Sequence, residues 1–170
     1  MNICLACFVT VKSELFSCNS SQALLAGLSD SQFSGSNFYN SMTSFEQSRL
    51  NGPNAWASAV VDSTQHLQAD LGEMKIIAKF ATQGTGHTSS EWVTSYKFGY
   101  SIDGVTYSMV KDGYLDKVFT GNTDSDTVVE HTFDNVIVAS YVRVYPRTWQ
   151  GHISLRWEVY ECRSTGKHKY

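Results

Sequence analysis

The sequence predicts an all-β fold, built as a sandwich or a barrel, and three observations lead to it. From about Ser29 onward the apolar residues recur with a period of two rather than 3.6. Residue pairs that favour turns separate these segments. No stretch keeps an apolar stripe of helical spacing for three turns. Many short strands with turns between them are typical of sandwiches and barrels.

The expected strands are rich in β-branched and aromatic residues. They are Met74–Phe80, Trp92–Ser101, Thr127–Phe133, Val136–Tyr145 and Ile153–Tyr160. In the last of these, alternation places four apolar residues on one face: Ile153, Leu155, Trp157 and Val159. Because Gly, Asn and Asp suit the backbone angles of tight turns, we expect turns at Asp103-Gly104, Gly121-Asn122 and Asp134-Asn135.

Length and charge restrict the class of protein. A chain of 170 residues suits one domain, and 42% hydrophobic against 17% charged residues is enough for a packed core. The net charge of −3 lacks the broad basic field of a nucleic-acid binder, so we expect no nucleic-acid partner. No apolar segment is long enough to span a bilayer, so we expect no transmembrane segment.

The cysteines and one sequon indicate an extracellular glycoprotein. Four cysteines, at positions 4, 7, 18 and 162, allow three pairings if all are oxidised. Asn19-Ser20-Ser21 is an N-glycosylation sequon directly after Cys18, and it makes Asn19 the expected glycosylation site. A sequon beside a disulfide favours a secreted chain.

The first residues allow two interpretations. Ile3 to Val11 is an apolar run of the length of a signal-peptide core, so we expect residues 1–17 to be a signal peptide or leader. Against cleavage, no Lys or Arg precedes the run and no clean cleavage site follows it, so a retained, loosely attached leader is the alternative. The roles of Cys4 and Cys7 stay open, and no second cysteine pair stands at zinc-ligand spacing.

Eight segments form a series along most of the chain. They are Leu28–Ser34, Ser48–Asn51, Asn54–Ala57, Leu67–Gly72, Ala81–Gly84, Trp92–Lys97, Val118–Asp124 and Ile153–Cys162. In this order and spacing they resemble the discoidin family, the coagulation factor V/VIII C-type domain, from about Cys18 to Cys162. The chain departs from the family's pattern at His66, Trp157 and Glu161, which alters packing locally.

The resemblance implies an eight-stranded discoidin jelly-roll-like β-sandwich with ligand-binding loops at one end. It also implies a disulfide between Cys18 and Cys162. Closing so long a loop stabilises the fold by roughly 5 kcal/mol on the chain-entropy model. The domain would then span residues 18–162, followed by a short basic tail at residues 163–170.

Members of this family bind their ligands at the tips of three loops. By position these loops are Gly35–Gln47, Asn51–Ala57 and Gly84–Glu91. The candidate ligand-binding residues within and beside them are Asn37, Phe38, Tyr39, Asn40, Met42, Phe45, Asn54, His87 and Trp92. Large apolar residues in a polar loop indicate anchors for a ligand. The alternative is that Phe38 and Phe45 fold under the loop as a small additional core.

Two charged groups of residues have simpler structural explanations. Arg49, Asp70 and Arg156 lie in strand-like motifs that recur as framework in the family, so we expect structural hydrogen bonds from them. The segment 122–126 is rich in Asn and Asp, but it lacks the glycine and glutamate of an EF-hand calcium loop and is typical of a polar hairpin. Some family members hold calcium near their loops, which leaves calcium open. We predict no cofactor and no metal site.

Catalysis has no support in the motifs. The sequence contains no Gly-x-Ser-x-Gly, no His-Glu-x-x-His and no phosphate-binding glycine loop. The five histidines are scattered without the spacing of metal ligands. We therefore expect a binding module with no catalytic residues.

Three ligand classes suit the family: carbohydrate, anionic phospholipid and extracellular protein. The first and third loops offer apolar side chains with Glu46 and Glu91 but no Lys or Arg, so attraction to phosphatidylserine should be weak. Asparagines and His87 beside aromatic rings suit a sugar, whose apolar face stacks on a ring while amides bind its hydroxyls. We expect a lectin-like or adhesion role on a cell-surface glycan, with an anionic membrane surface second and protein or matrix third. The oligomeric state is left open.

Overall fold

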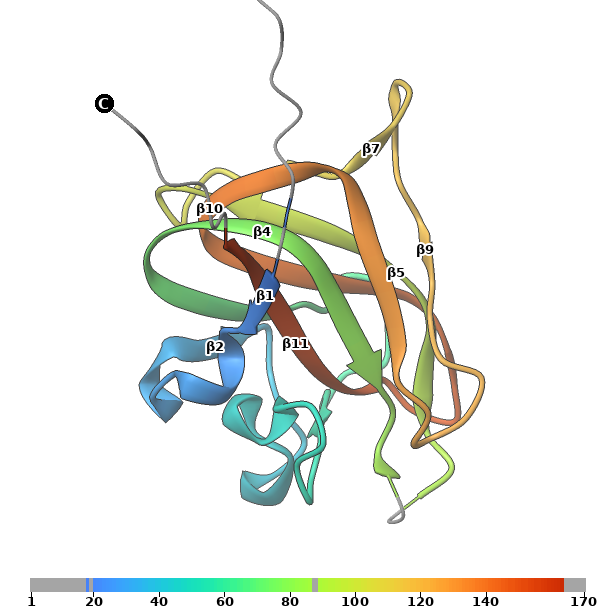
Figure 1. Ribbon diagram of the computed structural model, residues 1–170. Helices are drawn as coiled ribbons and strands as arrows, with labels where there is room; N and C mark the ends of the chain where they lie inside the picture. The colour runs from blue at the N-terminus through green and yellow to red at the C-terminus, as the bar shows by residue number, and fades with distance from the viewer. Residues whose placement is uncertain (1–17, 19, 87–88, 164–170) are drawn as a thin grey trace, which may run out of the picture.

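The computed structural model describes residues 18, 20–86 and 89–163, and over these residues the chain forms a β-sandwich with four short 3₁₀ helices (Figure 1). The elements are β1 (Ser20–Ala23), η1 (Leu25–Gly27), η2 (Asp30–Gln32), β2 (Phe33–Gly35), η3 (Ser41–Thr43), η4 (Phe45–Ser48), β3 (Trp56–Ala57), β4 (Leu67–Gln83), β5 (Trp92–Ser101), β6 (Ser108–Met109), β7 (Lys111–Asp112), β8 (Leu115–Asp116), β9 (Phe119–Thr120), β10 (Val129–Gln150) and β11 (Ser154–Arg163). All strand pairs between these elements are antiparallel.

Two long strands, β4 and β10, run through both layers of the sandwich. The second half of β4 pairs with β11 on one side and with the first half of β10 on the other. The first half of β4 pairs with β2 and with the second half of β10, which also pairs with β5. The β4–β10 register shifts between Thr132 and Ile137 and again between Ala139 and Tyr141. Such irregularities bend a strand, and both strands curve visibly in Figure 1.

The all-β sandwich is confirmed, but one predicted turn is wrong. Asp134-Asn135 does not separate two strands: it lies inside β10, which is a single strand of 22 residues. The same exposed, turn-favouring pair forms the irregular part of a continuous strand, because a bulge accepts the same backbone conformations as a turn. The described residues contain eleven strands, five of which have only two residues each.

Aromatic rings fill the space between the layers. The ring of Phe80 on β4 lies 4.7 Å from Phe98, 5.1 Å from Phe119 and 5.2 Å from Phe133, measured between centroids. Tyr96 is fully buried beside them, and its hydroxyl shares a hydrogen bond with Thr82 Oγ1. Much of the aromatic content therefore belongs to the core and is not available for ligands.

The first six residues of strand β11 are buried on both faces of the strand. The predicted inner face is confirmed, since Ile153, Leu155, Trp157 and Val159 are all fully buried. The alternate residues Arg156 and Glu158 are also buried. Glu158 accepts hydrogen bonds from the backbone N–H groups of residues 24, 25 and 26, which lead into and begin η1. The segments between β1 and β4 thus cover the second face of this strand.

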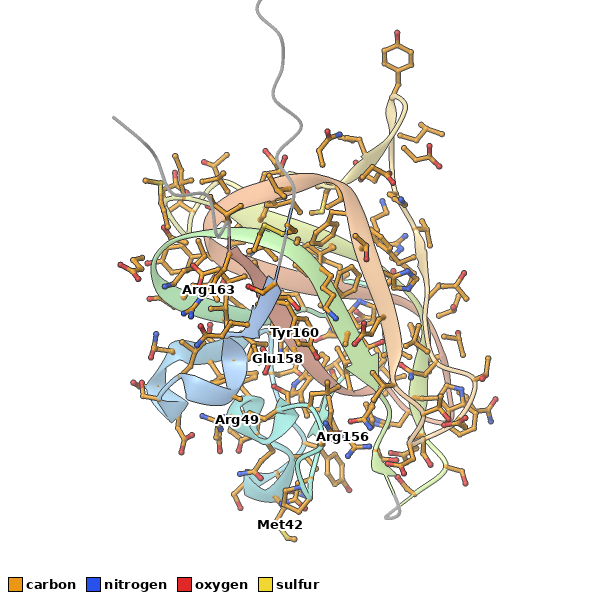
Figure 2. All side chains as sticks on the ribbon, viewed as in Figure 1. Met42, Arg49, Arg156, Glu158, Tyr160 and Arg163 are labelled. Carbon is orange, nitrogen blue, oxygen red and sulfur yellow. A yellow bond between two sulfur atoms is a disulfide. The ribbon has the colours of Figure 1, made fainter. Side chains whose placement is uncertain are left out.

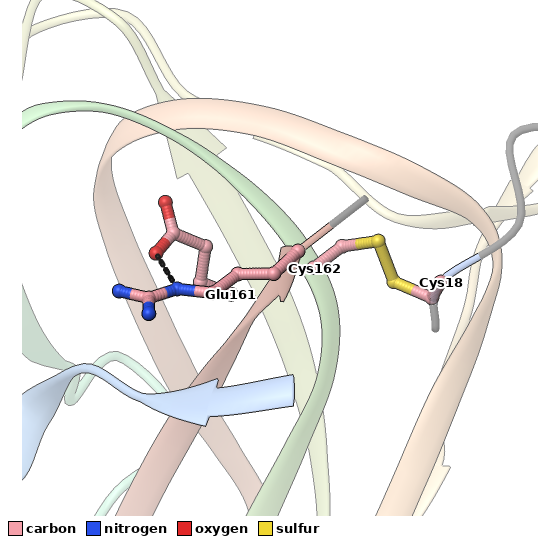
Figure 3. Close-up of a disulfide and its surroundings, with 4 residues drawn as sticks. Cys18, Glu161 and Cys162 are labelled. Carbon is pink, nitrogen blue, oxygen red and sulfur yellow. Dashed lines mark ion pairs between the residues drawn. A yellow bond between two sulfur atoms is a disulfide. The ribbon is translucent and has the colours of Figure 1, made fainter. Parts of the chain in front are cut away.

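A disulfide joins Cys18 to Cys162, with a Cα–Cα distance of 5.3 Å, as the family resemblance implied (Figure 3). Beside it, β1 pairs with β11, with Ser20 opposite Arg163. Cys4, Cys7 and Asn19 lie outside the described residues, as do residues 1–17 and 164–170, so the domain boundaries and the glycosylation site stay predictions. In the described part of the chain, no helix has the length and apolarity to cross a bilayer.

Candidate functional site

Several connecting segments gather at one end of the sandwich, the lower end in Figure 1. The segment with η3 and η4 leads into β3, which pairs with the start of β11. The loop before β5 and the turn between β10 and β11 meet it there, since residues of all these segments line one pocket. We call this the loop end of the molecule.

Two adjoining pockets form an open groove at the loop end. The first, of about 420 Å³, is lined by Tyr39, Asn40, Thr43, Ala57, Glu91 and His152. The second, of about 250 Å³, is lined by Asn40, Met42, Thr43, Asn54, Ala55, Ala57, Thr85, Ser89 and Glu91. Because the pockets share four residues, we treat them as one loop groove. Its lining residues include no Lys or Arg.

The groove has an aromatic wall. Tyr39 is 68% exposed, and its ring lies 6.3 Å from the His152 ring at an interplanar angle of 73°. The backbone N–H of Tyr39 donates to the carbonyl of Ala57 at 2.8 Å, which fixes the ring's position along the groove. Met42, 67% exposed, stands at the tip of the loop end (Figure 2).

Phe38 and Phe45 are less available to a ligand. Their rings meet edge to face with centroids 5.1 Å apart. Phe45 is partly buried and packs against the core, while Phe38 stays 42% exposed. Phe45 therefore fits the alternative of a small additional core under the loop. Phe38 contacts that core through Phe45 and still leaves part of its ring exposed for a ligand.

The three candidate asparagines have different places. Asn37 does not line the groove and instead stabilises the loop: its Oδ1 accepts from the Ala59 N–H at 2.7 Å, and its Nδ2 donates to Gln65 Oε1 at 2.7 Å. Asn54 lines the second pocket, where its Nδ2 donates to Gln47 Oε1 at 3.0 Å. Asn40 caps η3 by accepting from Met42 N–H, and its Nδ2 donates to no residue that the structure describes.

The remaining candidates and the residues that the sequence missed lie near the third loop. Trp92 begins β5 opposite Gln150 and does not line the groove, and His87 lies outside the described residues. Glu91 and His152 do line it. The signal for His152 was its place beside Gly151 in the β10–β11 turn, a fourth connection at the same end.

Buried Arg156 ties the loops together (Figure 2). Its guanidinium donates to the carbonyls of Gly84 at 2.8 Å, Gly52 at 3.0 Å and Ser125 at 3.2 Å, and to Asp126 Oδ1 at 3.1 Å. Gly86, with φ +73°, passes so close that a Cβ there would lie 3.2 Å from the Arg156 Nη2. Gly52 and Gly84 lie in two different loops, and Ser125 and Asp126 lie together in a third. Arg156 therefore fixes three loops at once.

The other framework residues also have structural roles. Arg49 donates to the carbonyls of Glu46 and Leu28, pairs with Asp30 at 2.7 Å and lies over the ring of Phe33. Asp70 accepts from the Gly72 N–H. These contacts agree with the framework role expected of them.

The segment 122–126 forms a hydrogen-bonded turn. Asn122 is buried and donates to the carbonyls of Thr82 and Thr127, and Asp124 Oδ1 accepts from the N–H groups of Asp126 and Thr127. In the described residues no group of three or more His, Cys, Asp or Glu side chains is placed to hold a metal ion.

Comparison with known sequences places these features in a family context. Residues 30–159 match the family described as the F5/8 type C domain. The chain is 42% identical over 111 residues to a discoidin-1 of Dictyostelium discoideum, covering 65% of this chain and 42% of that protein. It is 32% identical over 158 residues to human neuropilin-1, covering 90% of this chain and 17% of that protein. The chain thus spans less than half the length of these relatives.

Solved structures have the same fold. Discoidin II of Dictyostelium discoideum superposes with a TM-score of 0.77 at 29% identity, covering 88% of this chain and 62% of that one. A family 32 CBM from C. perfringens NanJ, solved in complex with galactose, superposes with a TM-score of 0.63 at 17% identity, covering 84% of this chain and all of that one. At 17% identity the second likeness bears on the fold alone.

Proposed function

The chain belongs to the F5/8 type C, or discoidin, domain family, and from this premise we propose that it binds carbohydrate in the loop groove as an extracellular recognition module. The domains of this family are non-catalytic binding domains. The observation that carries the proposal is an open groove with an exposed aromatic wall, several polar side chains and no Lys or Arg in its lining.

The groove offers what a sugar needs. The face of Tyr39 can stack on the apolar face of a pyranose ring, as aromatic side chains do with flat apolar surfaces. Asn40 Nδ2, His152 and Glu91 supply donors and acceptors for hydroxyl groups on the neighbouring walls.

Secretion is part of the proposal. The Cys18–Cys162 disulfide persists in oxidising compartments and is rare in the cytosol. The sequon at Asn19 and the extracellular relatives support the same location.

Anionic phospholipid is the second candidate, and one observation favours it: Met42, Tyr39 and Phe38 project from the loop end as apolar side chains. Membrane binding of this kind needs basic residues beside the apolar ones, because insertion and head-group attraction add. At the loop end, Arg156 and Arg49 are occupied by backbone carbonyls and by Asp126 and Asp30. This weakens the case for phosphatidylserine.

A glycan array run beside vesicle sedimentation tests the proposal. Tyr39→Ala should weaken sugar binding by about 1–3 kcal/mol, as expected for losing a buried aromatic contact, with little change in melting temperature. Tyr114→Ala, which removes a fully exposed ring outside the groove, is the matched control and should bind as the wild type does. An empty array together with salt-sensitive binding to phosphatidylserine vesicles would overturn the proposal in favour of the membrane.

A further inference from the structure

Glu91 is shared by the two pockets of the loop groove. It is the last residue before β5. Its Oε2 accepts a hydrogen bond from Ser154 Oγ at 3.1 Å. Its side chain lies against Gly151, where the backbone has φ +68° and a Cβ would lie only 3.1 Å from the Glu91 Cγ. A hydroxyl and a glycine thus hold this carboxylate in place.

The charge of Glu91 is uncompensated in the part of the chain that the structure describes. No Lys or Arg there forms an ion pair with it, and Ser154 is its one side-chain donor. Two other carboxylates of the connecting segments are satisfied by donors in their own segments. Glu46 accepts from Ser44 and Gln47, and Asp62 accepts from Thr64 and Gln65.

A partly buried carboxylate beside an aromatic ring selects its ligand by charge. An ammonium group on a sugar stacked against Tyr39 would form a charge-assisted hydrogen bond with Glu91, which is shorter and stronger than the bond from a neutral hydroxyl. A ligand with a carboxylate, sulfate or phosphate at this point would meet like charge instead. An N-acetyl group would remove the cation.

From this geometry we infer that the loop groove is selective for amino sugars, meaning glycans that carry a free, protonated amine, with Glu91 as the residue that reads the charge. The inference rests on the proposed function, because it specifies the class of sugar for the same groove.

Two matched series of probes test it. One comprises glucose, N-acetylglucosamine and glucosamine, and the other galactose, N-acetylgalactosamine and galactosamine, each as short oligosaccharides with the same linkage. Within a series only the group at one carbon changes. We expect the amino sugar of at least one series to bind about tenfold more tightly than its neutral partners, equivalent to ~1.4 kcal/mol. This preference should shrink as ionic strength rises, since salt screens charges.

Glu91→Gln keeps the shape of the side chain and removes its charge. It should abolish the preference, so that the amino sugar and its neutral partners bind the variant with affinities within about threefold of one another. Loss of folding would instead lower all three affinities and leave their ratio unchanged. Glu46→Gln removes one charge from the same end outside the groove lining, and it should keep the wild-type preference.

The outcomes separate the inference from the proposed function. If neutral sugars bind and the Glu91→Gln variant shows the same ratio as the wild type, the inference is overturned and the carbohydrate function stands. If no sugar of either series binds the wild type, the function and the inference fall together.

Discussion

The two ends of the sandwich are held together in different ways. At the loop end, polar side chains reach across to neighbouring loops. Buried Arg156 donates to backbone carbonyls of three loops, and partly buried Asn37 bonds to the Ala59 N–H and the Gln65 side chain of the β3–β4 connection. At the opposite end the β7–β8 hairpin projects away from the sheets (Figure 1), and its turn residue Tyr114 is fully exposed. Away from the loops, the chain is held by a covalent bond, the disulfide that joins β11 to the segment before β1.

The difference indicates that the loop end, and not the opposite end, needs an ordered arrangement of its side chains. A groove that binds a small ligand gains affinity when its walls are ordered beforehand, because less conformational entropy is lost on binding. Buried hydrogen bonds from a guanidinium to carbonyls supply that order at the loop end. A projecting hairpin with exposed apolar residues contributes little to the core and can vary without disturbing the groove.

Removing the disulfide should give the largest effect. Cys18→Ala with Cys162→Ala opens a loop with a sequence separation of 144, and the chain-entropy model gives a loss of about 5 kcal/mol. Denaturant unfolding under non-reducing conditions measures it. A loss of unfolding free energy below about 1 kcal/mol would show that β1–β11 pairing alone stabilises this end. The two ends would then not differ through a covalent bond.

Arg156→Lys should come second and should act on the loop end. Lysine keeps the charge but not the planar arrangement of donors, so several carbonyls lose their partner, at a cost of about 1.5–3 kcal/mol. Sugar affinity should fall together with the unfolding free energy, since the groove loops are loosened. Arg163→Lys, on a side chain 59% exposed at the other end of β11, is the control and should change stability by less than about 0.5 kcal/mol. Equal effects from both variants would remove the contrast.

Acidification should weaken the region under the first loop through His66. Partial burial and then the nearby charge of Arg143 lower the pKa of this imidazole. A depressed folded-state pKa means that the stability it contributes is present above the ordinary histidine pKa of about 6.5 and is lost as pH falls through the lowered value. His66→Phe keeps a ring against Tyr145, whose ring lies 5.8 Å from that of His66. Between pH 7.5 and pH 5 the melting temperature of this variant should fall less than that of the wild type. Parallel melting curves for both proteins would contradict this.

The hairpin should give the smallest effect. Tyr114→Ser with Leu115→Ser replaces two exposed apolar side chains, and the expected change in stability lies within about 0.5 kcal/mol. Sugar binding should be unchanged. Thermal unfolding and the glycan assay measure both, and a large loss of stability would show that this end depends on its surface residues as the loop end depends on its buried ones.

The sequence predicted the sandwich well because alternation reports which side chains face a core. The inner face of β11 and the strand Trp92–Ser101 were predicted as observed. It could not predict that the second face of β11 is covered as well, because Arg156 and Glu158 are polar and their partners lie far away along the chain. The disulfide pairing came from family resemblance and not from the spacing of the cysteines.

The groove was predicted only in outline. Asn37 and Asn40 are the same residue type in the same loop, yet one stabilises the loop and the other lines the groove. Trp92 and Glu91 are consecutive, but Trp92 is the first residue of β5 and Glu91 is the last residue of the loop before it, and only Glu91 lines the groove. His152 enters from a turn that lies far along the chain from Tyr39.

The position of β11 has a consequence for how the protein is made. This strand pairs with β1, β3 and β4, so the sheet on that side closes only when the segment 154–163 has been synthesised. Contacts between such distant segments make folding slow. Until then the nascent chain exposes the unpaired edge of β4, a hazard for aggregation on the ribosome. His152, Ser154 and Arg156 belong to the same late stretch of the domain, so the groove can acquire its walls only after nearly all of the sandwich has left the ribosome.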